Sequence, residues 1–178
     1  MSADEQSWIG FLRAVNLGAR RKFPKDAIKA VVEAVGGTGV ETYINTGNVR
    51  FDHPCSDRAE MERRLEEAFA EDRGFEVPTI CFTPAELAAV AAEAETIGAA
   101  YDGVYYISLL KSTATASACE ALEAKAGRDV PVRDRAAHLL AGEAYHTSTL
   151  DNALVERHLG VATARSAKVI RTIVERWG

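Results

Sequence analysis

The sequence has few cysteines, and their spacing gives no framework for a disulfide or a metal site. Cys55, Cys81 and Cys119 are odd in number and lie far apart. A disulfide-rich fold or a zinc knuckle would need closer pairs such as Cys-x-x-Cys. The histidines at positions 53, 138, 146 and 158 show no His-x-x-x-His spacing either. We therefore expect no metal and no cofactor, and only Cys55, which is close to His53 in the sequence, is a weak candidate for a reactive thiol.

The chain also lacks a long apolar run. No stretch approaches the roughly 20 residues that a membrane-spanning helix needs. The first six residues are polar and acidic, without the basic start and apolar centre of a signal peptide. With 47% hydrophobic and 26% charged residues, the composition is that of an ordinary globular protein. We therefore expect a cytoplasmic protein with no membrane partner.

Acidic residues are scarce in the segment from Arg13 to Lys29. The net charge is −5, yet between Arg13 and Lys29 six residues are basic and one, Asp26, is acidic. A basic patch on an acidic body suits a small anionic ligand or weak, local contact with nucleic acid. A solvated loop without a partner would show the same pattern.

Apolar periodicity and turn residues predict the elements of the first half. A buried strand is expected at 8–13, and Pro24 begins a helix that Gly36 and Gly37 end. Asp57 with Glu60 predicts the capped start of a second helix. The remaining strands are expected at 42–45, 48–52 and 77–82. This β-α-β-β-α-β order is typical of a ferredoxin-like unit, an antiparallel sheet with two helices on one face.

The second half nearly repeats this order after a glycine-containing segment at 98–103. Thr83, Pro84 and Glu86 predict the start of a linking helix. Further helices are expected at 115–126, 150–159 and 166–177, and strands at 104–110, 130–134, 137–141 and 143–146. We therefore predict an α+β protein of two ferredoxin-like halves, 1–97 and 98–178, in one compact body with a C-terminal helix.

Polar residues follow the first predicted strand and occupy the turn between the next two strands. Arg13 offers a planar fork of donors suited to phosphate or carboxylate, and the turn after Asn16 exposes backbone N–H groups. The structural alternatives are that Arg13 caps the strand end or pairs with an acid from the second predicted helix, and that the asparagines stabilise their own turn. The candidate ligand-binding residues here are Arg13, Asn16, Gly18, Lys22, Asn45, Thr46, Gly47 and Asn48.

A further candidate group precedes the last predicted helix. Arg165 and Lys168 lie at its N-terminus, where unpaired N–H groups and the helix dipole favour an anion. His146 is the one histidine considered as a weak acid or base, because it ends a predicted strand. No nucleophile elbow or dinucleotide-binding loop is present, since Gly36 to Gly39 follows a helix and precedes a strand.

Several blocks resemble a bacterial family of unknown function, DUF1697. The matching blocks are Leu12 to Gly18, Lys22 with Pro24, Thr42 to Phe51, Tyr145 to Thr147, and Asn152 to Arg165. The resemblance implies two ferredoxin-like halves and no activity. Two segments depart from the family pattern. The family has a basic residue where this chain has Ser148-Thr149-Leu150, and Asn-Trp where it has Ser166-Ala167. The resemblance therefore does not extend to the basic residue and the tryptophan of these two segments.

The leading hypothesis is a protein that binds a small anionic or nucleotide-like ligand in a basic cleft. One alternative is a nucleic-acid-associated module, because ferredoxin-like sheets can stack bases on aromatic residues such as Tyr105 and Tyr106. The acidic pI of about 5.4 disfavours it. Another alternative is a non-catalytic interaction domain that docks through its amphipathic C-terminal helix. The sequence identifies no reaction and sets no oligomeric state.

Overall fold

The chain divides into two compact units, each described separately below. The structure is a computed structural model, which describes residues 4–143 and 147–178. One unit comprises Met1–Ala85 with Trp177, and the other comprises Glu86–Arg176 with Gly178. The division expected at 97/98 falls near the end of helix α3 (Pro84–Gly98), whereas this one falls near its start.

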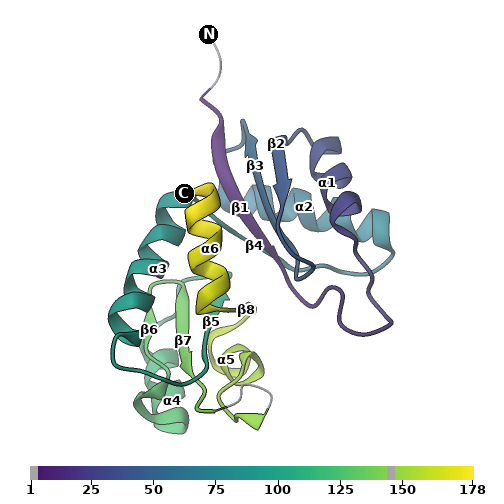
Figure 1. Ribbon diagram of the computed structural model, residues 1–178. Helices are drawn as coiled ribbons and strands as arrows, with labels where there is room; N and C mark the ends of the chain where they lie inside the picture. The colour runs from purple at the N-terminus through teal and green to yellow at the C-terminus, as the bar shows by residue number, and fades with distance from the viewer. Residues whose placement is uncertain (1–3, 144–146) are drawn as a thin grey trace. The chain divides into compact units, whose positions relative to one another are not determined.

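The first unit has the expected β-α-β-β-α-β order (Figure 1). Its sheet is antiparallel throughout, with the strand order β2-β3-β1-β4. The central pair, β1 and β3, places Trp8 opposite Phe51 and Phe11 opposite Asn48. These features confirm the ferredoxin-like topology. The elements are β1 (Gln6–Leu12), α1 (Lys25–Ala34), β2 (Thr38–Thr42), β3 (Asn48–His53), α2 (Arg58–Arg73) and β4 (Thr79–Phe82).

The core of this unit lies between its sheet and the two helices. Alternate residues of β1, such as Trp8 and Leu12, point toward the helices and are almost fully buried. Helix α2 contributes the predicted stripe of Met61, Leu65 and Phe69. This helix begins as predicted, because the Asp57 carboxylate accepts a hydrogen bond from the Glu60 backbone N–H at 2.8 Å.

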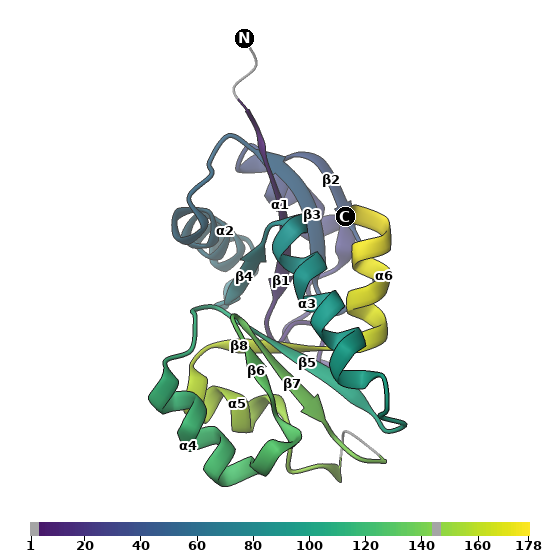
Figure 2. The same cartoon turned by 90° about the vertical axis from the view of Figure 1, so that its left-hand side faces the viewer.

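The second unit repeats the topology of the first. Its antiparallel strands lie in the order β6-β7-β5-β8, which matches β2-β3-β1-β4 position for position. Helices α4 and α5 share a core with one face of this sheet (Figure 2). After α3 the elements are β5 (Tyr105–Leu110), α4 (Ala116–Ala126), η1 (Gly127–Asp129), β6 (Val132–Arg133), β7 (Ala136–Leu140), α5 (Asn152–Leu159), β8 (Ala162–Ser166) and α6 (Ala167–Trp177).

Two strands differ from those predicted. Strand β2 is Thr38–Thr42 rather than 42–45, because Ile44 has φ 51°, a left-handed conformation that a strand excludes. The closing strand of the second unit is β8, which the sequence did not predict. The strand expected at 143–146 lies largely outside the described residues, and Glu143 itself is in a turn.

Both units protect the outer edge of their last strand in the same way. In the first unit, the α2 carboxylates of Glu62 and Glu66 accept hydrogen bonds from the Cys81 and Thr79 backbone N–H groups at 2.8 and 2.9 Å. In the second unit, Asn152 and Glu156 of α5 bond to the Ala162 backbone, as donor and acceptor, at 2.9 and 3.1 Å. Each pair is spaced i, i+4, which puts both side chains on one helix face. Occupied edges resist pairing with other chains.

Candidate functional site

Two loops meet at one end of the first sheet. The first follows β1 and spans residues 13–22, and the second precedes β3 and spans residues 43–47. Because β1 and β3 are antiparallel neighbours, the end of one strand lies beside the start of the other. The Leu12 backbone N–H donates to the Gly47 carbonyl at 2.8 Å, and the Arg13 N–H donates to the Pro78 carbonyl at 2.8 Å. We call residues 13–22 and 43–47 the paired loops.

Asn16 joins the two loops through its side chain. Its Nδ2 donates to the Asn45 carbonyl at 2.7 Å and to the Phe23 carbonyl at 2.8 Å. Its Oδ1 accepts from the Phe23 backbone N–H at 2.8 Å. The carboxamide therefore makes three hydrogen bonds within the protein and acts as a positioning group for both loops.

The second loop is held by Asn48 and by the shape of Gly47. Asn48 is 1% exposed, and its Nδ2 donates to the Tyr43 carbonyl and the Thr46 hydroxyl, both at 2.9 Å. These two bonds hold the Asn48 side chain inside the turn. Gly47 has φ 82°, and a Cβ atom there would lie 2.7 Å from the Leu12 Cβ. Glycine is thus required for this close approach.

Left-handed backbone is concentrated in the paired loops. Within the described part of the chain, five residues other than glycine have positive φ, and four of them are in these loops. Such a conformation costs of order 1–3 kcal/mol at a residue other than glycine and recurs at functional sites. For a β-branched residue such as Ile44 it is a genuine outlier. The four residues are Ala14, Asn16, Arg21 and Ile44, with φ of 56°, 56°, 56° and 51°.

The basic side chains of the first loop have different roles. Arg21 is part of the loop structure, since it donates to the Ala14 and Glu76 carbonyls at 2.7 and 2.6 Å and lies over the Phe75 ring. Arg20 and Lys22 are exposed, and Arg13 is half-buried. Leu17, at 69% exposure, presents an apolar side chain beside Gly18. The loop surface therefore combines exposed cations with one apolar residue.

Arg165 and Lys168 belong to the second unit. Arg165 is in β8 and is buried, and its guanidinium donates to the Thr163 hydroxyl and the Ala164 carbonyl, both at 2.9 Å. Burial lowers the pKa of this guanidinium to about 10. Ser166 already caps α6 by accepting from the Val169 N–H at 3.2 Å, whereas Lys168 is exposed. Burial of Arg165 weakens the case for an anion site at this helix end.

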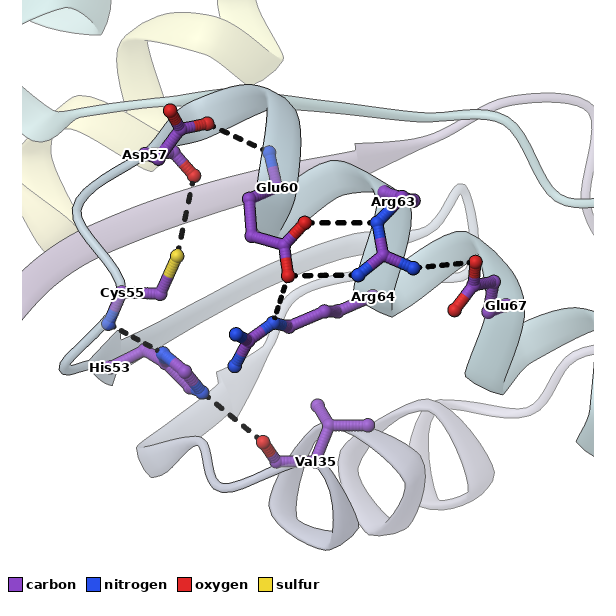
Figure 3. A network of polar contacts seen from close by, with 8 residues as sticks. All are labelled: Val35, His53, Cys55, Asp57, Glu60, Arg63, Arg64 and Glu67. Carbon is purple, nitrogen blue, oxygen red and sulfur yellow. Dashed lines mark hydrogen bonds and ion pairs between the residues drawn. The ribbon is translucent and has the colours of Figure 1, made fainter.

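The histidine nearest to Cys55 is turned away from its thiol (Figure 3). His53 Nδ1 accepts from the Cys55 backbone N–H at 2.8 Å, and Nε2 donates to the Val35 carbonyl at 3.1 Å. The Cys55 thiol itself donates to the Asp57 carbonyl at 3.5 Å. Both nitrogens of the imidazole are thus used by backbone groups, so His53 does not act as a base for this cysteine. His146, the other acid–base candidate, lies outside the described residues.

An exposed ion-pair network follows on α2 (Figure 3). Arg63 and Arg64 both bond to the Glu60 carboxylate, at 2.8 and 2.7 Å, and Arg63 also reaches Glu67 at 2.6 Å. Hydrogen bonds from Arg63 and then Arg64 lower the pKa of Glu60 to about 2. These groups lie on the solvent-facing side of α2 with i, i+3 and i, i+4 spacing, which is typical of ion pairs that stabilise a helix. The network therefore needs no functional explanation.

Sequence patterns did not indicate a buried polar pair in the second unit. The Tyr105 hydroxyl is 2.7 Å from His138 Nδ1, and burial lowers the pKa of His138 to about 4. His138 is fully buried, and its Nε2 has no hydrogen-bond partner among the described residues. Strands β5 and β7 are buried almost throughout, so no alternation of apolar and polar residues marks the pair in the sequence. The imidazole is therefore held neutral at physiological pH.

Residues 4–143 and 147–178 contain neither a metal-binding cluster nor a membrane-spanning helix. No group of three or more His, Cys, Asp or Glu residues there has the arrangement of a metal site. None of the helices in residues 4–143 and 147–178 has the length and apolarity needed to cross a membrane.

Comparisons with known proteins place the chain in a family and support its fold. A search of curated proteins returns no match. Among solved structures, the chain is similar to a conserved bacterial protein, SP0830 from Streptococcus pneumoniae, with a TM-score of 0.70 and 19% identity. That match covers 98% of this chain and 99% of the other, and it supports the two-half fold. The family model described as "Protein of unknown function (DUF1697)" matches residues 6–138. The chain therefore belongs to the DUF1697 family.

Proposed function

We propose that the paired loops bind a small anionic ligand that carries a phosphate or carboxylate group. The observation that carries this proposal is the concentration of left-handed backbone in two loops that Asn16 ties together. Hairpin turns that need positive φ usually place Gly, Asn or Asp there. Positive φ at Ala14, Arg21 and Ile44 therefore carries an energetic cost that a simple connection between strands does not require. A loop that must present its backbone and side chains in one fixed arrangement does require it.

The residues around these loops supply the attraction for an anion. Lys22 and Arg20 are exposed, and the half-buried Arg13 follows the last residue of β1. Guanidinium and ammonium groups bind phosphate or carboxylate through charge-assisted hydrogen bonds. Leu17 adds an apolar contact, which favours an organic anion such as a nucleotide over a bare inorganic ion. The carboxamides of Asn16 and Asn48 take a positioning role, because the loops already use their hydrogen bonds.

A thermal-shift experiment with matched charge variants tests the proposal. Inorganic phosphate, adenosine monophosphate and citrate are added to the parent, to Lys22→Ala and to Lys29→Ala. The control residue, Lys29, is exposed on α1 and pairs with Glu33 at 3.8 Å. Lys29→Ala therefore removes the same charge as Lys22→Ala, but outside the paired loops. A probe at about 100 times its dissociation constant stabilises the parent by about 2.7 kcal/mol. Lys29→Ala retains this gain and Lys22→Ala loses most of it.

Two results would contradict the proposal. One is the absence of stabilisation by all three anions, and the other is equal stabilisation of the two variants. Retention on single-stranded RNA, measured across salt concentrations, separates the nucleic-acid alternative. Strongly salt-dependent binding that Lys22→Ala weakens would reassign the same loops to a polyanion.

A further inference from the structure

A hollow in the second unit lies beside the edge strand β6. It encloses about 400 Å³, a size within the range of small-ligand sites. Its wall combines one face of α4 with the segment that leads into β6. The lining residues are Cys119, Glu123, Gly127, Val130, Pro131, Val132 and Arg133.

The base of this hollow is apolar and fixed. Val130 is 4% exposed, and Val132 and Cys119 are half-buried and pack against the second core. Gly127 leaves space, because a Cβ atom at that position would meet nothing within 4 Å. An apolar group of modest size can therefore enter without displacing the core.

Two exposed side chains of the hollow, Glu123 and Arg133, carry opposite charges but do not form an ion pair with each other. In the part of the chain that the structure describes, the Glu123 carboxylate makes no hydrogen bond or ion pair. Arg133 uses one N–H group in a hydrogen bond, which Nη1 donates to the Val132 carbonyl at 3.0 Å. A guanidinium has five N–H donors, so most of its capacity remains. The two groups form no ion pair with one another, so each is available to a ligand group of opposite charge.

The backbone of β6 adds a donor on the same edge. The Pro131 carbonyl accepts from the His138 N–H at 2.8 Å, so Pro131 is bonded to β7. Alternation along an antiparallel strand then turns the N–H and carbonyl of the next residue, Val132, away from β7. The bond from Arg133 to the Val132 carbonyl agrees with this direction. Because β6 ends the strand order, no other strand of this sheet pairs with its outer side.

We propose that this hollow binds a small zwitterion with an apolar body, such as a free amino acid. The carboxylate would bond to Arg133 and the Val132 N–H, the ammonium group to Glu123, and the side chain would lie over Val130 and Cys119. Such a molecule requires a carboxylate for its ammonium group, a guanidinium and a backbone N–H for its carboxylate, and an apolar floor for its side chain. The hollow supplies all of these groups. This site is independent of the paired loops, since all of its residues are in the second unit.

Alkylation of Cys119 reports occupancy of the hollow. The intact protein is treated with iodoacetamide, and labelling of each cysteine is followed by peptide mass spectrometry. Cys55, half-buried in the first unit, is the internal reference. L-leucine at about ten times its dissociation constant slows alkylation of Cys119 about elevenfold and leaves Cys55 unchanged, if bound protein does not react. Leucinamide, which lacks the carboxylate, and N-acetyl-leucine, which lacks the ammonium group, protect far less at the same concentration.

Matched variants locate the two charged contacts. Glu123→Gln and Arg133→Gln abolish protection by leucine, whereas Glu120→Gln, an exposed residue of α4 outside the hollow, retains it. All three side chains are exposed, so unchanged circular dichroism is expected. The proposal is overturned if leucine does not protect Cys119, if all three probes protect equally, or if Glu123→Gln responds like Glu120→Gln. The probe series on the parent protein remains decisive if a variant misfolds.

Discussion

Replacing Asn16 by aspartate tests how the paired loops are held. The substitution keeps the size of the side chain and its tolerance of left-handed backbone, but it removes both Nδ2 donations, to Phe23 and to Asn45. Each lost hydrogen bond is worth about 0.5–1.5 kcal/mol. The new carboxylate also faces two carbonyl oxygens at the former donor positions. We expect Asn16→Asp to lower the free energy of unfolding by about 3 kcal/mol.

Asn45→Asp is the matched control because it makes the same change of charge and shape in the same loops. Only the backbone carbonyl of Asn45 accepts the bond from Asn16, and the Asn45 side chain is exposed. This control should change the free energy of unfolding by no more than about 0.5 kcal/mol. Urea unfolding followed by tryptophan fluorescence measures both values, since Trp8 is buried in the core of the first unit. Equal effects of the two substitutions would refute the positioning role of Asn16.

Three further predictions concern stability. Gly47→Ala should cost more than about 2 kcal/mol because its Cβ would lie 2.7 Å from the Leu12 Cβ, whereas Gly74→Ala, with similar φ and open space, should cost only about 1 kcal/mol in thermal unfolding. Glu62→Ala should destabilise by about 1–3 kcal/mol, since it leaves the buried Cys81 N–H without its carboxylate, while Glu62→Gln should retain most of the stability in the same assay. The third prediction follows from the lowered pKa of His138, about 4 against 6.5 in the unfolded chain. The unfolded state takes up the proton first, so stability is present above pH 6.5 and falls by about 3 kcal/mol between pH 6.5 and 4. His138→Gln should remove this dependence in pH-resolved urea unfolding and His158→Gln should not; identical profiles would contradict the assignment.

The topology could be predicted from the sequence wherever local signals agree. Asp57 and Glu60 predicted the start of α2, and apolar spacing from Met61 to Phe69 predicted its buried face. Strand β2 was misplaced because the apolar Ile44 suggested a strand, while its backbone conformation is set by the turn. Strand β8 was missed because Arg165 and Ser166 are typical of a polar helix start, and only pairing with β5 reveals a strand there.

The partners of polar side chains were less predictable than the elements. Asn16 and Asn48 stood out by their place after and before strands, but the carbonyl groups that they bond depend on tertiary contacts. The hollow beside β6 left no motif in the sequence, because Cys119 and Arg133 come from different elements. Residues of a site assembled across elements are recognised only once the strand order is known.

Backbone-amide NMR during titration with adenosine monophosphate tests the proposed function most directly. We expect saturable shift changes that concentrate in residues 13–22 and 43–47, that persist in Lys29→Ala and that weaken in Lys22→Ala. Shift changes confined to other parts of the chain, or the same changes in both variants, would contradict anion binding by the paired loops.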